Sequence, residues 1–157
     1  MASMDQETQD KRDRLLQYIY IAGEYDDYCD QLARLENAQY IPAAVESDGS
    51  KHTNGGSDRM ANAVLRRIEY EESIQDDMEK LTAEMKIIEE AVSNLKDGRE
   101  RRLMRLRYIT GSEDGRKHMK WPDVAIKLFG QDDEAQVASV WRIHRSALKH
   151  ISFPDSK

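Results

Sequence analysis

Residues 121–151 read WPDVAIKLFGQDDEAQVASVWRIHRSALKHI, a stretch that predicts two short helices. Pro122 suits the first position of a helix, where its missing N–H is not needed, and Gly130 suits the residue that ends one. After a short turn, a second helix is predicted to run to about Ile151. Two helices joined at a glycine predict a helix-turn-helix.

The second predicted helix is amphipathic. One narrow arc is apolar and is expected to face a small core: Val140, Ile143, Ala147 and Ile151. The opposite side is polar and basic: Ser139, Arg142, Ser146 and Lys149, with Arg145 nearby. The DNA major groove admits one helix, phosphates attract cations and base edges pair with polar groups, so this face predicts contact with duplex DNA.

A run of five arginines precedes these helices. Residues 99–109 read RERRLMRLRYI and predict a short helix with Leu103, Leu106 and either Met104 or Tyr108 facing inward. The arginines are then expected outside, either as a solvated basic face or as a surface for phosphate. The two helices that follow favour the second interpretation.

Three segments together resemble region 4 of bacterial sigma factors, and more closely the sigma-like phage late-transcription activators of the RinA and ArpU type. These segments are LMRLRYI at residues 103–109, WPDVA at 121–125 and VWRIHRSALK at 140–149. The resemblance covers residues 99–151, about a third of the chain. It implies a phage or prophage transcription regulator that binds DNA near a promoter, and it leaves open a contact with the host RNA polymerase.

The resemblance also implies roles for individual residues. By position, Gln136, Ser139 and Arg142 are expected to face base edges. Phosphate contacts are expected from Lys120, Arg145 and Lys149. Trp141 is expected on the flank of the buried face, packed in the core rather than against a thymine methyl group.

The chain departs from the family in three places. Lys120 stands where the family usually has a Ser or Thr cap, and the connection from Ile109 to Trp121 is longer than usual. The stretch from Gly130 to Val140 is also longer, and three of its residues are acidic: Asp132, Asp133 and Glu134. Acids at that end are expected to cap and lengthen the second helix.

The front of the chain predicts two long helices around a loop. Residues 10–36 carry an apolar stripe at helical spacing: Leu15, Tyr18, Ile19, Ala22, Tyr25, Cys29, Leu32 and Leu35. Residues 42–57 are rich in Ser, Gly and Asn and are expected to form a flexible loop. A helix is then predicted from Ser57 or Asp58 to Lys96, closed by Asp97 and a left-handed Gly98.

That long helix carries an uninterrupted heptad seam over three heptads. Its members alternate by four and three: Ile74, Met78, Leu81, Met85, Ile88, Val92 and Leu95. The seam must pair with the first helix, with a second copy of the chain, or with both. We therefore expect an all-α fold, in which residues 1–98 form an acidic helical hairpin or coiled coil that oligomerises. Residues 99–157 form a sigma region 4-like helix-turn-helix that binds DNA.

Charge and composition agree with this division. Residues 99–157 hold 13 of the 24 Lys and Arg and 8 of the 30 Asp and Glu, a net +5, whereas the first 98 residues hold the other 11 and 22, a net −11. A basic end can sit on phosphate while an acidic end stays clear of it. The single cysteine, the lack of a long apolar run and the lack of a signal-peptide pattern predict a cytoplasmic protein without a membrane span. The resemblance implies that this cytoplasm is that of a bacterial host cell.

Catalytic motifs are not recognisable in the sequence. Cys29, His52, His118, His144 and His150 lack metal-ligand spacing, and neither a glycine-rich phosphate loop nor a nucleophile elbow occurs. We therefore expect no enzyme, no cofactor and no metal. Two alternatives to the regulator stay open: a small terminase subunit-like DNA-packaging protein, and a module that docks on RNA polymerase without binding DNA itself.

Overall fold

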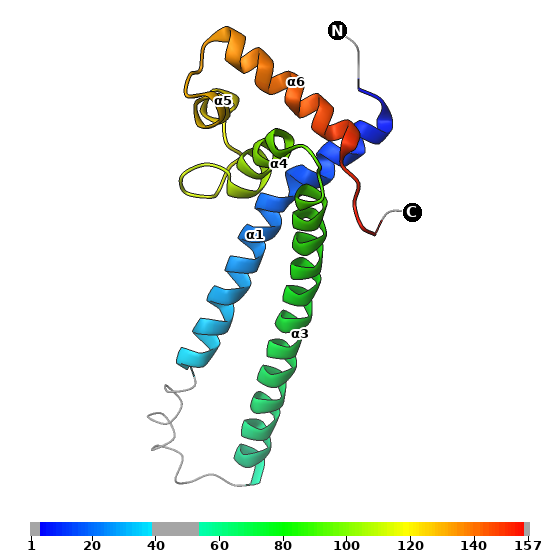
Figure 1. Ribbon diagram of the computed structural model, residues 1–157. Coiled ribbons are helices and arrows are strands. Elements are labelled where there is room, and N and C mark those ends of the chain that lie inside the picture. The colour runs from blue at the N-terminus through cyan, green and yellow to red at the C-terminus, as the bar shows by residue number, and fades with distance from the viewer. Residues whose placement is uncertain (1–3, 39–53, 156–157) are drawn as a thin grey trace. The chain divides into compact units, whose positions relative to one another are not determined.

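The computed structural model describes residues 4–38 and 54–155, and every regular element within them is helical. The elements are α1 (Gln6–Ala38), α3 (Asn54–Ser93), α4 (Gly98–Met104), the π-helical turn η2 (Arg105–Thr110), α5 (Trp121–Phe129) and α6 (Glu134–His150) (Figure 1). The predicted all-α class is confirmed for these residues. Most of the predicted loop at 42–57 lies outside them, but residues 54–57 already belong to α3.

The chain forms two compact units. The first joins Met1–Gly23 with Ala83–Lys157, and the second comprises Glu24–Thr82. The predicted boundary between residues 98 and 99 therefore falls inside the first unit. The reason is a shared core, in which apolar side chains from both long helices pack with those of the C-terminal helices.

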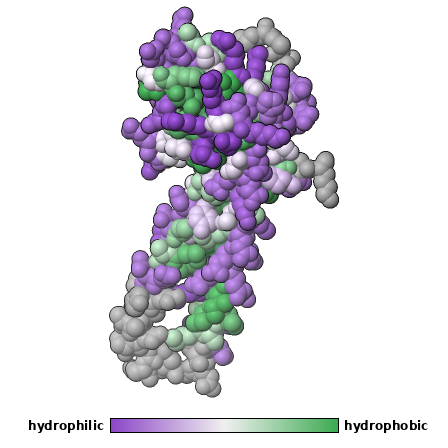
Figure 2. All heavy atoms as spheres, viewed as in Figure 1, coloured by the Kyte–Doolittle hydropathy of each residue, from purple (hydrophilic) through white to green (hydrophobic). Residues whose placement is uncertain are grey.

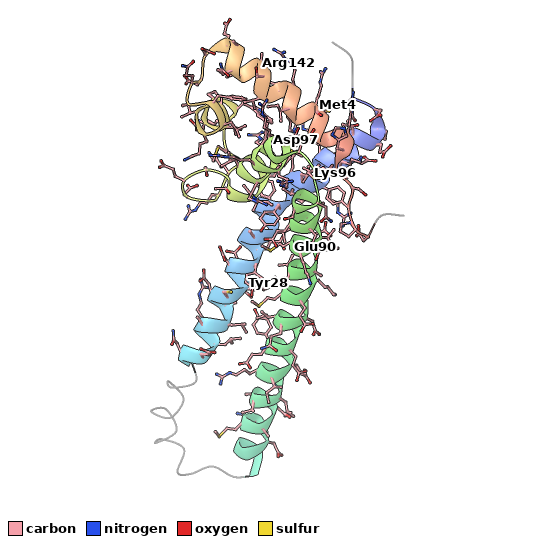
Figure 3. The ribbon with its side chains drawn as sticks, viewed as in Figure 1. Met4, Tyr28, Glu90, Lys96, Asp97 and Arg142 are labelled. Carbon is pink, nitrogen blue, oxygen red and sulfur yellow. The ribbon has the colours of Figure 1, made fainter. Side chains whose placement is uncertain are left out.

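In the second unit, α1 and α3 run antiparallel. The Tyr28 hydroxyl donates to Asp77 Oδ2 at 3.3 Å, and the Tyr70 hydroxyl donates to Gln31 Oε1 at 3.2 Å. The residue number on α3 thus falls as the residue number on α1 rises. Figure 3 shows the Tyr28 side chain between the two helices. Ile74 is buried there, as the heptad seam predicts.

Some apolar side chains of this unit stay in solvent. Figure 2 shows hydrophobic residues gathered on the visible side of the first half of α3, where four are about half exposed: Met60, Val64, Leu65 and Ile68. Cys29, which was expected in the apolar stripe of the first helix, is exposed. The predicted homo-oligomer stays a prediction.

The first unit is built on one continuous core. The seam residues Ile88, Val92 and Leu95 are buried on α3 and meet the buried Leu15 and Ile19 of α1. The same cluster includes buried residues of the C-terminal elements: Leu103, Met104, Tyr108, Val124, Ala125, Val140, Ala147, Leu148, Ile151 and Phe153. The predicted seam is thus satisfied within the chain here, and its last turns hold the C-terminal helices in place.

The junction between α3 and α4 corrects one prediction. α3 ends at Ser93, and Asp97 caps the next helix instead of closing this one, because its carboxylate accepts from the Arg99 amide at 2.8 Å (Figure 3). Gly98 is the first residue of α4 and does not have the positive φ that was predicted. Asp97 and Gly98 therefore belong to the start of α4 and not to the end of α3.

The loop after η2 requires a glycine at Gly111. Its φ is +70°, and a Cβ there would lie 2.6 Å from both Ile19 Cδ1 and the Lys117 carbonyl oxygen. The loop closes with the Ser112 amide donating to the Lys117 carbonyl at 2.8 Å. This close approach packs the loop against α1.

Removal of a core side chain on α1 should destabilise the C-terminal helices. Leu15 is fully buried, so Leu15→Ala should lower the free energy of unfolding by about 2–5 kcal/mol. Both tryptophans lie in the first unit, so their fluorescence during urea denaturation reports this loss. The exposed Ile68→Ala should change the value by less than about 0.5 kcal/mol. An unchanged tryptophan transition in Leu15→Ala would show that the C-terminal helices fold without α1.

Candidate nucleic-acid interface

α5 and α6 are joined by a four-residue turn, Gly130 to Asp133. Gly130 ends α5 in the left-handed conformation, with φ 79° and its amide on the Ile126 carbonyl at 2.7 Å. Asp133 caps α6, because its side chain accepts from the Gln136 amide at 2.9 Å. The end at Gly130 was predicted, and the cap is one of the three acids expected to provide it. The longer stretch before Val140 is thus accounted for by this turn and by the first turns of α6.

One side of α6 is exposed along its whole length. Its members recur at helical spacing: Ala135, Ala138, Arg142, Arg145 and Lys149. We call these five residues the outer face of α6. Arg142, labelled on α6 in Figure 3, lies in the middle of this face. Three of the six predicted site residues therefore share one exposed surface.

Two predicted base readers do not lie on the outer face. Gln136 and Ser139 are only partly exposed, and the Ser139 hydroxyl donates to the Ala135 carbonyl at 3.0 Å. Ser146, predicted on the polar side, is also partly buried and donates to Glu100 Oε1 at 2.6 Å. The buried arc of α6 includes His144 and Leu148, which the sequence analysis left out, and these two rotate the exposed side toward Ala135 and Ala138.

Lys120, the sixth predicted residue, is exposed just before α5 and caps it with no side-chain bond. The next residue, Trp121, packs on Trp141 of α6 with ring centroids 4.6 Å apart. Lys120 therefore lies at the start of α5, next to a residue that contacts the middle of α6. Trp141 packs on this neighbour but keeps 44% of its surface exposed, so the expected core position is only half correct.

The arginine run is divided between structural and free side chains. Three of the five arginines donate to backbone carbonyls, and two of these, Arg101 and Arg107, are only partly exposed, which corrects the prediction that all lie outside. Arg101 donates to Leu95 at 2.7 Å, and Arg102 donates to Lys127 at 3.0 Å. Arg107 donates to Met119 and stacks on the Trp121 ring, with 4.4 Å from its Cζ to the ring centroid. Arg99 and Arg105 stay exposed.

The lysines and arginines of the C-terminal helices form no ion pair with the described residues. No Lys or Arg from Arg99 to Lys149 has its nitrogen within 4.0 Å of a carboxylate belonging to residues 4–38 or 54–155. The ion pairs that do occur there involve Lys11, Arg14, Lys86 and His150. The cations of the outer face are therefore available to an anionic partner.

Acidic side chains lie at the N-terminal end of the same helix. Asp132 and Glu134 are exposed on either side of the capping Asp133. They favour the helix because its N-terminus is the positive end of its dipole. They would also repel phosphate, so the available positive potential lies along the middle and last turns of α6.

Behind the outer face, α6 is anchored by a buried hydrogen bond. His144 Nε2 lies 2.5 Å from the Tyr108 hydroxyl, and both residues are at most 2% exposed. Burial, with the nearby charges of Arg107 and Arg12, lowers the pKa of His144 from its ordinary 6.5 to about 3. His144 is therefore neutral, and the pair fixes the rotation of α6 against η2.

A second anchor holds the last turns of α6 to α4. The carboxylate of Glu100, which is only 3% exposed, accepts from the Ser146 hydroxyl at 2.6 Å and lies 2.9 Å from His150 Nδ1. Glu100 was not predicted to have a role, although it is the one acid within a run of arginines on an amphipathic helix. Lys149, which lies between Ser146 and His150 in the sequence, stays exposed to solvent.

The buried histidine should make stability depend on pH. The unfolded chain takes up a proton at His144 near pH 6.5, whereas the folded chain does so only near pH 3, so the free energy of unfolding falls as the pH drops below 6.5. From pH 7 to pH 5 this one group should cost about 2 kcal/mol. His118, whose pKa burial also lowers, adds a loss of the same sign.

Urea denaturation at pH 7 and pH 5 tests this dependence. His144→Gln cannot take up that proton, so its stability should fall by about 2 kcal/mol less than that of the wild type over the same interval. The carboxylates with lowered pKa, such as Asp114 and Asp155, act only below about pH 4 and leave this window clear. Equal losses in the two proteins would contradict a neutral, buried His144.

Neutralisation of Glu100 should weaken the hold of α4 on α6. Glu100→Gln replaces one acceptor oxygen of a buried group by a donor, so we expect a loss of about 1–3 kcal/mol in the free energy of unfolding. Thermal or urea denaturation measures it, with the exposed Glu113→Gln as the matched control. A loss no larger than that of the control would mean that the buried carboxylate does not stabilise the fold.

Comparison with known proteins adds no relative, since no family model, curated protein or solved structure matches the chain. Within the described residues, no helix is long and apolar enough to cross a membrane, and no group of three or more His, Cys, Asp or Glu side chains is placed to hold a metal ion.

Proposed function

We propose that the chain binds duplex DNA as a transcription regulator of the phage or prophage type, with α5–α6 acting as a helix-turn-helix and α6 entering the major groove. One observation carries the proposal. Arg142, Arg145 and Lys149 share the outer face of α6, and none has a carboxylate partner among the described residues. Lysines and arginines without carboxylate partners can contact DNA phosphates. The second helix of a helix-turn-helix is the one that lies in the major groove.

The proposed roles follow from position on that face. Arg142 lies in its middle and reads a base edge, since arginine forms bidentate hydrogen bonds with guanine. Arg145 and Lys149 follow it on that face, and Lys120 is exposed before α5; these three contact phosphates, which position the protein without reading sequence. Gln136 and Ser139 are not proposed as readers, because they lie off the outer face.

The charge distribution supports a polyanionic partner such as DNA. The basic C-terminal part follows a front half that carries a net −11, so phosphate would attract one end of the chain and repel the other. Such a division orients the protein on a polyanion. RNA polymerase docking without DNA binding, and DNA packaging, remain the outcomes against which the proposal is tested.

The test is a fluorescence-anisotropy titration with a duplex from the DNA around the gene and with a random duplex, over a range of salt concentrations. Arg142→Ala should lose about 1–3 kcal/mol of preference for the first duplex. Lys149→Ala should weaken both duplexes alike and reduce the salt slope by about one unit. The control is Arg66→Ala, an equal change of charge at an exposed position in the other unit.

Three results would count against the proposal. No DNA preference at any salt concentration would favour the polymerase-docking module. Equal, sequence-independent losses from Arg142→Ala and Lys149→Ala would contradict the division into base and phosphate contacts. Assembly into a large ring that binds DNA without regard to the promoter would favour a packaging protein.

A further inference from the structure

The outer face of α6 places small apolar side chains where a base-reading helix would have its closest approach. Ala135 and Ala138 are exposed there, two turns and one turn before Arg142 respectively. The polar residues beside them, Gln136 and Ser139, are turned partly inward, and the Ser139 hydroxyl is already used by the Ala135 carbonyl. On this face, the neighbour of Arg142 on the N-terminal side is therefore Ala138, whose side chain is a single methyl group.

We infer that Ala138 is a specificity-determining residue that packs against the 5-methyl group of a thymine, within two base pairs of the guanine read by Arg142. This inference rests on the proposed function. Apolar side chains such as alanine read thymine through that methyl group, the only apolar feature of a base edge in the major groove. A methyl side chain also lets the helix backbone approach the groove floor more closely than a longer side chain would.

The geometry of the helix limits where the thymine lies. Ala138 and Arg142 are four residues apart, about 6 Å along the axis. Base pairs are spaced by about 3.4 Å, so the two contacts span about two steps. The thymine is therefore expected within two base pairs of the guanine.

The acidic end of α6 supports the same register. Glu134 lies one turn before Ala138, and Asp132 is also exposed. A helix that entered the groove by its first turn would bring these carboxylates close to phosphates. Entry by the middle of the helix leaves the acids outside and puts Ala138, Arg142 and Arg145 against the DNA.

The experiment removes the methyl group of the thymine and, separately, the methyl group of Ala138. A tightly bound duplex is first selected from a random pool with the wild-type protein, and each of its thymines is then replaced singly by deoxyuridine, which lacks only the methyl group. One position should weaken wild-type binding about 4-fold, the effect of one buried methyl group. Ala138→Gly should bind the two duplexes equally.

Matched variants separate this contact from a general effect on the helix. Ala135→Gly makes the same change one turn earlier on the exposed face and should keep the 4-fold deoxyuridine effect. Ser139→Ala should keep both the effect and the affinity, because its hydroxyl faces the helix backbone. If Ala138→Gly keeps the full effect, or if no thymine matters to the wild type, the inference is wrong.

The result also separates this inference from the proposed function. Specific binding that depends on Arg142 but on no thymine methyl group would overturn only the assignment of Ala138. Failure to select any duplex would overturn both.

Discussion

The C-terminal helices depend on the apolar core that they share with the ends of α1 and α3. Residues 99–157 are few, and a chain of about 60 residues buries a smaller share of its surface than a larger domain and is only marginally stable by itself. Leu15 and Ile19 from α1, with Ile88 and Val92 from α3, supply the missing apolar surface. The start of α1 and the end of α3 are therefore part of the platform on which α5 and α6 are held.

Buried polar contacts then set the rotation of α6 on this platform. Hydrophobic contacts are non-directional, so an apolar arc defines the rotation of a helix less sharply than hydrogen bonds do. The Tyr108–His144 pair and the Glu100 carboxylate are directional and buried, so a rotated helix would leave polar groups without partners. They fix which residues face outward, and so turn Ala138 and Arg142, rather than Ser139, to the solvent.

Periodicity was sufficient to predict the helices, the heptad seam and the caps at Gly130 and Asp133, because these depend on local spacing and local hydrogen bonds. It was not sufficient for Gly98, which begins a helix, for the fate of Arg101, Arg102 and Arg107, or for the inward turn of Ser146. Those features depend on which carbonyl or carboxylate lies opposite, and that is decided by contacts between residues distant in sequence. Four predicted site residues are exposed as expected, and none forms an ion pair with the described residues: Lys120, Arg142, Arg145 and Lys149.

The most direct measurement is an NMR titration of the labelled chain, which is 18.2 kDa, with a selected DNA duplex. The account predicts that amide resonances of Ala138, Arg142 and Arg145, together with Lys120, shift most, and that those of residues 24–82 stay in place. Shifts confined to residues 24–82, or no shift at any duplex concentration, would contradict DNA binding through the outer face of α6.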